Sequence, residues 1–243
     1  MNKQPVFKKE KAVNAILYVA SKLERSDIHK ICKILYFADQ KSLSECGRSI
    51  TGDTYIAMNY GPVPSYIEDI FKAVRHQSYF SRYAKEFEGI FSFQNDYILK
   101  AEKLPDMQHL SKSDVECLDY AIGKCKDLDF GQLTLLSHGY AWSSTAKDRP
   151  ISVDDILKEV GDGDDYIDFV NEMIALERAT VWWRYQISTN IMTIEKSTLA
   201  TNIADGTANI VGEMQTTHLT ELLSAARESD LFTDYEKATY LSV

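Results

Sequence analysis

The chain has 243 residues, of which 44% are hydrophobic and 26% charged, proportions typical of one sizeable globular domain with room for a small appendage. Its net charge of −9 is uneven, since residues 1–50 carry 10 Lys and Arg against 5 Asp and Glu, whereas residues 101–185 carry 9 against 17. Most of the chain would repel a phosphate backbone, which argues against nucleic-acid binding and favours a basic protein partner. Acidity can also serve solubility alone.

The N-terminal composition and the cysteines favour a cytoplasmic protein. No apolar run approaches the roughly 20 residues that span a bilayer, so we expect no membrane insertion. Residues 1–11 are basic and polar, without the apolar core of a signal peptide. The cysteines lie far apart and form no C-x-x-C pair, which favours reduced, packed thiols. They are Cys32, Cys46, Cys117 and Cys125.

The first part of the chain predicts two helices followed by a strand. Apolar residues recur at helical spacing over residues 10–23 and again after Asp27, which is suited to cap a helix, with Gly47 as the stop. Residues 54–60 then alternate β-branched and aromatic side chains with the period of a strand.

The next segments predict a turn, a helix and a second β element. Pro62 and Pro64 predict a turn, because proline fixes the backbone and cannot donate to a sheet. Helical spacing resumes over residues 65–74. The aromatic stretch 79–104 predicts a short antiparallel hairpin or meander, with turns at Gly89 and at Asn95-Asp96.

The later segments are predicted to be helical. Ser111 or Ser113 begins a helix, and Ser113 with Glu116 fits a capping box. Apolar spacing indicates further helices over residues 130–142, 153–160 and 165–188.

Together these elements predict an α+β fold, a mostly helical single domain with a small antiparallel β-hairpin or sheet, over residues 1–186. Beyond this range the composition shifts to Thr, Ser, Asn and Ala, and aromatic residues thin out. We therefore expect residues 187–243 to form a helical or partly disordered appendage.

No metal site is expected. His29 and Cys32 can share a helix face, but a structural zinc needs four ligands and no second close pair of Cys or His lies nearby. Residues 162–165 resemble the start of a calcium loop. Tyr166 and Ile167 stand where that loop needs Asp or Asn and then Gly, so helix capping by the acids fits better.

No catalytic site or cofactor is expected either. Ser137 and His138 are adjacent, and adjacent helical residues point about 100° apart, so they do not form a nucleophile–base pair. His138 and Trp142, four residues apart, predict a packed pair of rings, with a catalytic base at His138 as the alternative. Residues 47–52 lack the G-K-[ST] ending of a phosphate loop.

Aromatic residues gather around the proline pair. Tyr36, Tyr55 and Tyr60 either anchor an interface or fill the seam between helix and hairpin. Asp39 is an acid on an otherwise apolar helix. We expect it to pair with a backbone group or with Arg48 across the turn.

Several of these motifs recur in a characteristic order over residues 10–185. They are Leu35-Tyr36-Phe37-Ala38-Asp39, Gly47 to Tyr55, Tyr60-Gly61-Pro62-Val63-Pro64, the helical block 110–119, and Leu133 to Trp142. Each motif is weak alone, but the ordered set resembles the Panacea domain, the SocA-like antitoxin domain of bacterial and phage toxin–antitoxin pairs. The resemblance implies a mostly helical fold with a small hairpin.

It also implies a non-enzymatic function, the neutralisation of a cognate toxin protein by direct binding. Toxins of this family include alarmone-synthetase-like enzymes. Another member type resembles a proteolytic adaptor that delivers its toxin to an ATP-dependent protease, which is the alternative function.

The expected partner-facing surface is centred on Tyr55, Tyr60 and the 62–64 turn, flanked by the end of the helix that holds Tyr36. The candidate partner-binding or family-motif residues are Tyr36, Asp39, Gln40, Thr51, Asp53, Tyr55, Tyr60, Pro62, Pro64, His138 and Trp142.

Overall fold

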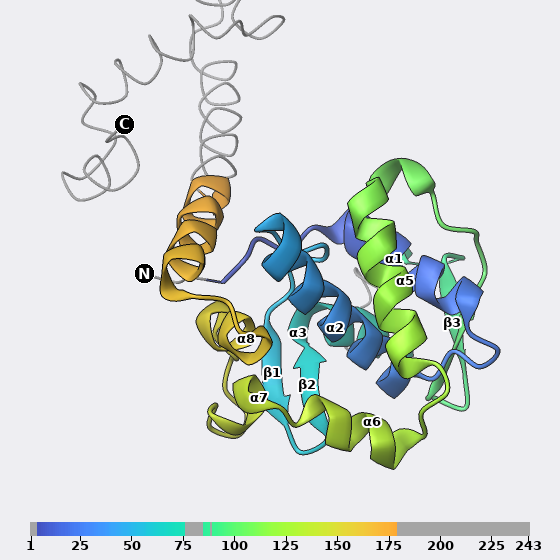
Figure 1. Ribbon diagram of the computed structural model, residues 1–243. Helices are drawn as coiled ribbons and strands as arrows, with labels where there is room; N and C mark the ends of the chain where they lie inside the picture. The colour runs from blue at the N-terminus through green and yellow to red at the C-terminus, as the bar shows by residue number, and fades with distance from the viewer. Residues whose placement is uncertain (1–3, 76–84, 88, 179–243) are drawn as a thin grey trace, which may run out of the picture. The chain divides into compact units, whose positions relative to one another are not determined.

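The computed structural model describes residues 4–75, 85–87 and 89–178, and the chain up to Ala175 forms one unit. Its fold is α+β, as predicted, a mostly helical unit with two small antiparallel sheets beside the central helices (Figure 1). The predicted boundary at residue 186 and the appendage 187–243 lie outside the described residues.

Helix α2 (Ile28–Cys46) is the central element. The Asp27 carboxylate accepts hydrogen bonds from the N–H groups of His29 and Lys30 at its start, and Gly47 ends it in the left-handed region, as the sequence predicts. Every residue from 31 to 40 is buried. A helix buried on all sides needs neighbours on all sides, and α5 (Lys112–Cys125) crosses its outer face (Figure 1).

The other helices pack against α2 or against elements that contact it. They are α1 (Lys9–Lys22), α3 (Ser65–Arg75), α6 (Phe130–Ser137), α7 (Tyr140–Ser143) and α8 (Val153–Val160), with a 3₁₀ turn at Met107–His109. Residues 164–178 are also helical, which confirms the described part of the helix predicted from 165. Among the described residues, no helix combines the length and apolar character needed to cross a membrane.

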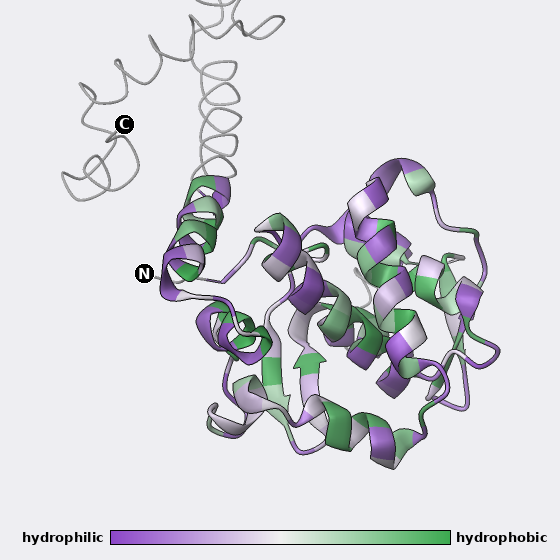
Figure 2. Cartoon of the chain, in the orientation of Figure 1, coloured by the Kyte–Doolittle hydropathy of each residue, from purple (hydrophilic) through white to green (hydrophobic). Residues whose placement is uncertain are grey.

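The proline pair forms a strand and not the predicted turn. Strand β1 (Tyr55–Met58) pairs with β2 (Gly61–Pro64), joined by Asn59 and Tyr60, and both strands carry hydrophobic positions (Figure 2). Just beyond the register, the Ser65 N–H donates to the Thr54 carbonyl. Because hydrogen-bonded positions alternate, both prolines fall at positions whose nitrogen faces away from β1, where proline is tolerated.

The opposite edge of β1 is also paired. The Ala57 N–H donates to the Arg149 carbonyl at 3.0 Å, and the Ile151 N–H donates to the Tyr55 carbonyl at 2.8 Å. The first strand of this short hairpin is therefore hydrogen-bonded along both edges. An isolated two-stranded hairpin has only one paired edge on each strand and is marginally stable.

The second predicted β element is confirmed where it is described. Strands β3 (Phe91–Gln94) and β4 (Ile98–Ala101) pair antiparallel, and Asn95 and Asp96 take positive φ angles in the turn. Residues 79–84 of the predicted stretch lie outside the described residues.

Two local helix predictions were wrong. Helix α5 begins after its N-cap Ser111, one of the two predicted starts, but its capping box pairs Ser111 with Asp114 and not Ser113 with Glu116. The single helix predicted over 130–142 is broken, since α6 ends at Ser137 and α7 begins at Tyr140.

Gly52 is the position where the fold most needs glycine. Its φ is +67°, and an added Cβ would lie 1.8 Å from the Val6 carbonyl oxygen. We expect Gly52→Ala to lower the free energy of unfolding by about 3 kcal/mol or more, because backbone strain adds to a backbone clash.

Gly161→Ala is the matched control for that measurement by chemical denaturation. Gly161 also has a positive φ, +89°, but open space surrounds its Cβ position, so it should cost only about 1 kcal/mol. Equal costs for the two variants would contradict the close packing of residues 6 and 52.

Candidate functional site

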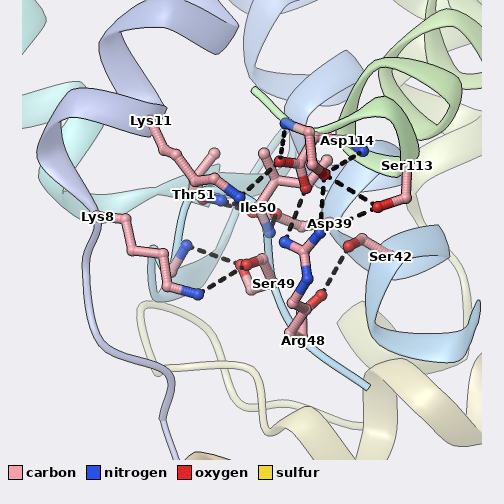
Figure 3. A network of polar contacts seen from close by, with 12 residues as sticks. Lys8, Lys11, Asp39, Ser42, Arg48, Ser49, Ile50, Thr51, Ser113 and Asp114 are labelled. Atoms are coloured by element: carbon pink, nitrogen blue, oxygen red, sulfur yellow. Dashed lines mark hydrogen bonds and ion pairs between the residues drawn. The ribbon is translucent and has the colours of Figure 1, made fainter. Parts of the chain in front are cut away.

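The site is built around a buried carboxylate on α2. Asp39 is 1% exposed and accepts hydrogen bonds from two backbone groups, the N–H of Ile50 at 2.7 Å and that of Thr51 at 3.0 Å, both on Oδ1 (Figure 3). Its Oδ2 accepts from the Thr51 hydroxyl and, at 2.8 Å, from the Tyr55 hydroxyl. Burial and the Asp39 charge raise the pKa of Tyr55, which keeps that hydroxyl a donor.

A second buried carboxylate, Asp53, fixes the helix that follows the hairpin. It accepts hydrogen bonds from the N–H groups of Tyr66 and Ile67, both at 2.9 Å, at the start of α3. Burial raises the pKa of Asp53 to about 7, although these backbone donors favour the charged form. The Thr51 hydroxyl accepts from the Asp53 backbone N–H, so one threonine connects the Asp39 carboxylate to the backbone of Asp53.

A buried lysine supports the hairpin from the α2 side. Lys33 is 1% exposed, and its Nζ donates to the Pro62 carbonyl at 2.8 Å. A Cβ added to Gly61 would lie 2.8 Å from that nitrogen and 2.2 Å from the Ser137 hydroxyl, so glycine makes room for both. Burial lowers the pKa of Lys33 to about 8, because it disfavours the charged form.

Arg48 pairs with Asp114 of α5 and not with Asp39, so the backbone alternative for Asp39 is the correct one. The guanidinium lies 2.7 Å from Asp114 Oδ1, and Lys11 Nζ lies 2.6 Å from Oδ2 (Figure 3). Burial favours the neutral acid, but hydrogen bonds from Lys11, Ser111 and Arg48 outweigh it and hold the pKa of Asp114 below its ordinary value.

Glu159 of α8 joins three helices, a role that the sequence did not indicate. Its Oε1 accepts from the Gln40 side chain at 2.8 Å, and its Oε2 accepts from the Ala141 N–H at 2.7 Å, at the start of α7. Nothing in the sequence distinguishes Glu159 from the other acidic residues of the chain. Its carboxylate fits here because residue 139 is a glycine, whose added Cβ would lie 2.4 Å from Oε2.

These supports leave an uncharged aromatic surface at the tip of the hairpin. Tyr60 is 60% exposed and meets Phe130 of α6 edge to face, with ring centroids 5.3 Å apart. Phe130, 52% exposed, also packs on His29, whose pKa is lowered to about 4 by burial and by nearby Lys33. Beside the tip, Met58, Trp142 and Lys147 help to line an open cleft of about 300 Å³.

Most of the predicted surface residues are buried. Tyr36, Gln40 and Tyr55 are 0%, 5% and 3% exposed, so they do not form the flank of an exposed surface. Tyr36 and Tyr55 pack on each other between α2 and the hairpin, and Gln40 bonds Glu159 of α8. The same holds for Asp39, Thr51 and Asp53, and Pro62 and Pro64 are buried in β2. Of the hairpin residues predicted to face a partner, Tyr60 is exposed, and Phe130 beside it was missed by sequence analysis.

His138 and Trp142 stack with ring centroids 3.6 Å apart and an interplanar angle of 1°, which confirms the predicted ring pair. They meet across the break between α6 and α7 and not along one helix face. The indole N–H donates to the Met58 carbonyl at 2.8 Å, so Trp142 braces the hairpin tip. Among the described residues, no group of three or more His, Cys, Asp or Glu is placed to hold a metal ion.

Comparison with known families agrees with the sequence motifs. Residues 31–143, just under half of the chain, match the family model described as "Antitoxin SocA-like, Panacea domain". This range contains all but the first turn of α2, both hairpins, α5, α6 and α7, and it confirms the resemblance noted from the sequence. No match to a curated protein or to a solved structure was found.

Replacement of Asp39 tests whether its carboxylate holds the hairpin in place. Asp39→Ala leaves two buried N–H groups and two hydroxyls without their acceptor, so we expect a loss of about 3 kcal/mol or more in unfolding free energy. Asp39→Asn should cost less, because its carbonyl can accept both N–H bonds and the hydroxyls can turn to accept from the amide. Exposed Asp127→Ala should change stability by less than about 0.5 kcal/mol in the same denaturation series.

The lowered pKa of Lys33 predicts a specific pH dependence. Between pH 8 and 10.5 the unfolded chain holds a proton on this lysine that the folded chain has released, so the contribution of Lys33 to stability should rise with pH by up to about 1.4 kcal/mol per unit. Lys33→Met carries no titrating group and removes this contribution. The difference in unfolding free energy between wild type and Lys33→Met, measured across that range, should therefore increase with pH, and a flat difference would contradict the assignment.

Proposed function

We propose that this protein is a cytoplasmic, non-catalytic antitoxin that neutralises a cognate toxin protein by direct binding. The match of residues 31–143 to the SocA-like Panacea domain is the observation that carries the proposal. The proposed binding domain covers residues 1–186. The family toxins noted above make an alarmone-synthetase-like enzyme one candidate partner.

The arrangement of the site supports binding over catalysis. The polar motif residues, including Asp39, Thr51 and Asp53, form their hydrogen bonds with other groups of the protein. The exposed groups at the hairpin tip, Met58, Asn59 and Tyr60, are uncharged, and aromatic residues and Met are enriched in protein interfaces. A hairpin held by Asp39, Lys33 and Trp142 would lose little conformational entropy when it docks.

We therefore place the toxin-binding surface at Tyr60 and Phe130, with the cleft beside Met58 and Trp142 as its continuation. Tyr60 offers large contact area with few rotatable bonds and keeps a hydroxyl for hydrogen bonding. The cleft can take an apolar side chain of the partner.

Co-expression with the product of the adjacent gene tests the function. The adjacent product alone should arrest growth, and this protein should restore it. A harmless neighbour, or one that stays toxic in the presence of this protein, would disprove the proposal. The half-life of the toxin separates the two modes of action, since a shortened half-life favours delivery to a protease and an unchanged half-life favours direct inhibition.

The binding surface has its own test in Tyr60→Ala. Loss of a central aromatic anchor should weaken toxin binding by about 2 kcal/mol or more, roughly thirtyfold, with little change in melting temperature. Tyr97→Ala, which removes a tyrosine that is 65% exposed at the turn of the other hairpin, is the matched control and should bind normally in calorimetric titration. Equal affinities for both variants would place the interface elsewhere.

A further inference from the structure

The helix at residues 164–178 lies outside the matched segment and has a surface that the hairpin does not use. Ile167, Val170 and Ile174 are buried in the core on one side of this helix. The Tyr166 hydroxyl donates to the Leu43 carbonyl at 3.0 Å, which ties the helix to α2. These contacts determine which side of the helix faces outward.

The outward side combines apolar and acidic residues. Phe169 and Met173, one helical turn apart, are 49% and 43% exposed. Asp165, Asp168 and Glu172 are exposed, and at about 100° per residue they fall on the strip beside the two apolar side chains. No Lys or Arg occurs between residues 159 and 177, so no basic residue of the same segment neutralises this strip.

The apolar part of this face is also held in position. A Cβ added to Gly47 would lie 3.2 Å from the Phe169 ring, so the ring rests against the backbone at the end of α2. Tyr166 lies beside it, with ring centroids 6.0 Å apart. An exposed aromatic side chain that is already supported loses little freedom when a partner covers it.

We propose that the surface formed by Asp165, Asp168, Phe169, Glu172 and Met173 docks a basic amphipathic helix of the partner protein. Its apolar stripe would cover Phe169 and Met173, and Lys or Arg residues along one flank would face the acidic strip. Charge complementarity selects this occupant, since an acidic or uncharged helix would leave the carboxylates desolvated without partners. This inference rests on the proposed function and names the chemistry of the toxin segment.

The experiment uses the full chain and a fluorescein-labelled peptide of about 18 residues, in which Leu recurs at helical spacing (i, i+3, i+4, i+7) and Lys fills the remaining positions, so that it forms an amphipathic helix. The same peptide with Glu in place of Lys is the reversed-charge probe. In fluorescence anisotropy titrations the Lys peptide should bind and the Glu peptide should not. Removal of the acidic strip by Asp165→Asn, Asp168→Asn and Glu172→Gln together should weaken binding of the Lys peptide by about tenfold or more.

A second triple variant removes equal charge elsewhere. Glu24→Gln, Glu116→Gln and Asp127→Asn change exposed residues on other elements and should leave binding unchanged. If both triple variants weaken Lys-peptide binding equally, the peptide is attracted by net charge alone and the proposal is overturned. If the Lys peptide does not bind the wild-type chain, there is no docking face and the proposal is also overturned. Met173→Ala should also weaken binding of the Lys peptide. Unchanged affinity in this variant would contradict an apolar contact between Met173 and the peptide.

Co-expression distinguishes a failure here from a failure of the proposed function. Full rescue from the toxin by the first triple variant, with rescue lost in Tyr60→Ala, would overturn the docking face and leave the antitoxin function standing. No rescue by the wild type, with peptide selectivity as expected, would overturn the antitoxin function and leave the recognition of a basic helix standing.

Discussion

The buried carboxylate of Asp39 is the interaction on which the rest of the site depends. An acid that is 1% exposed is tolerated only when donors surround it, and here they come from the loop after α2 and from β1. Both carboxylate oxygens have their donors because the loop and β1 lie against the same residue of α2. The Thr51 hydroxyl bonds both Asp39 and the Asp53 N–H, and the Asp53 carboxylate in turn accepts from an N–H at the start of α3. One helix residue therefore determines where the hairpin begins and where the chain goes after it.

The same network separates the residues that build the hairpin from those that can meet a partner. Lys33 and Trp142 hold the backbone of the hairpin from two sides, through the carbonyls of Pro62 and Met58. Met58, Asn59 and Tyr60 remain exposed at the tip, and the Tyr60 ring lies next to Phe130. A rigid support with an uncharged aromatic end fits the binding role proposed for a SocA-like antitoxin domain, because the free energy of ordering is met during folding and not during binding.

The sequence predicted the helices, the α+β class and the resemblance to the Panacea domain, since these depend on local periodicity, caps and ordered motifs. It failed where a tertiary contact decides the outcome. Pro62 and Pro64 suggest a turn by composition, yet they fit a strand because their nitrogens face away from β1. Phe130 and Glu159 carry no local signal, as their roles come from α6 lying beside the hairpin and α8 lying beside α2. The sequence left open whether Tyr55 is buried or exposed, because its burial depends on the tertiary hydrogen bond from its hydroxyl to Asp39.

The hairpin is proposed to be fully built before it presents its tip to a toxin. Hydrogen–deuterium exchange of the full chain, alone and with the purified product of the adjacent gene, can follow both parts of this proposal. We expect new protection at residues 58–61 and 130–142 in the complex, with the amides of Ile50 and Thr51 already protected in the free protein by Asp39. Unchanged exchange at the hairpin tip, or strong protection of Ile50 and Thr51 appearing only in the complex, would contradict it.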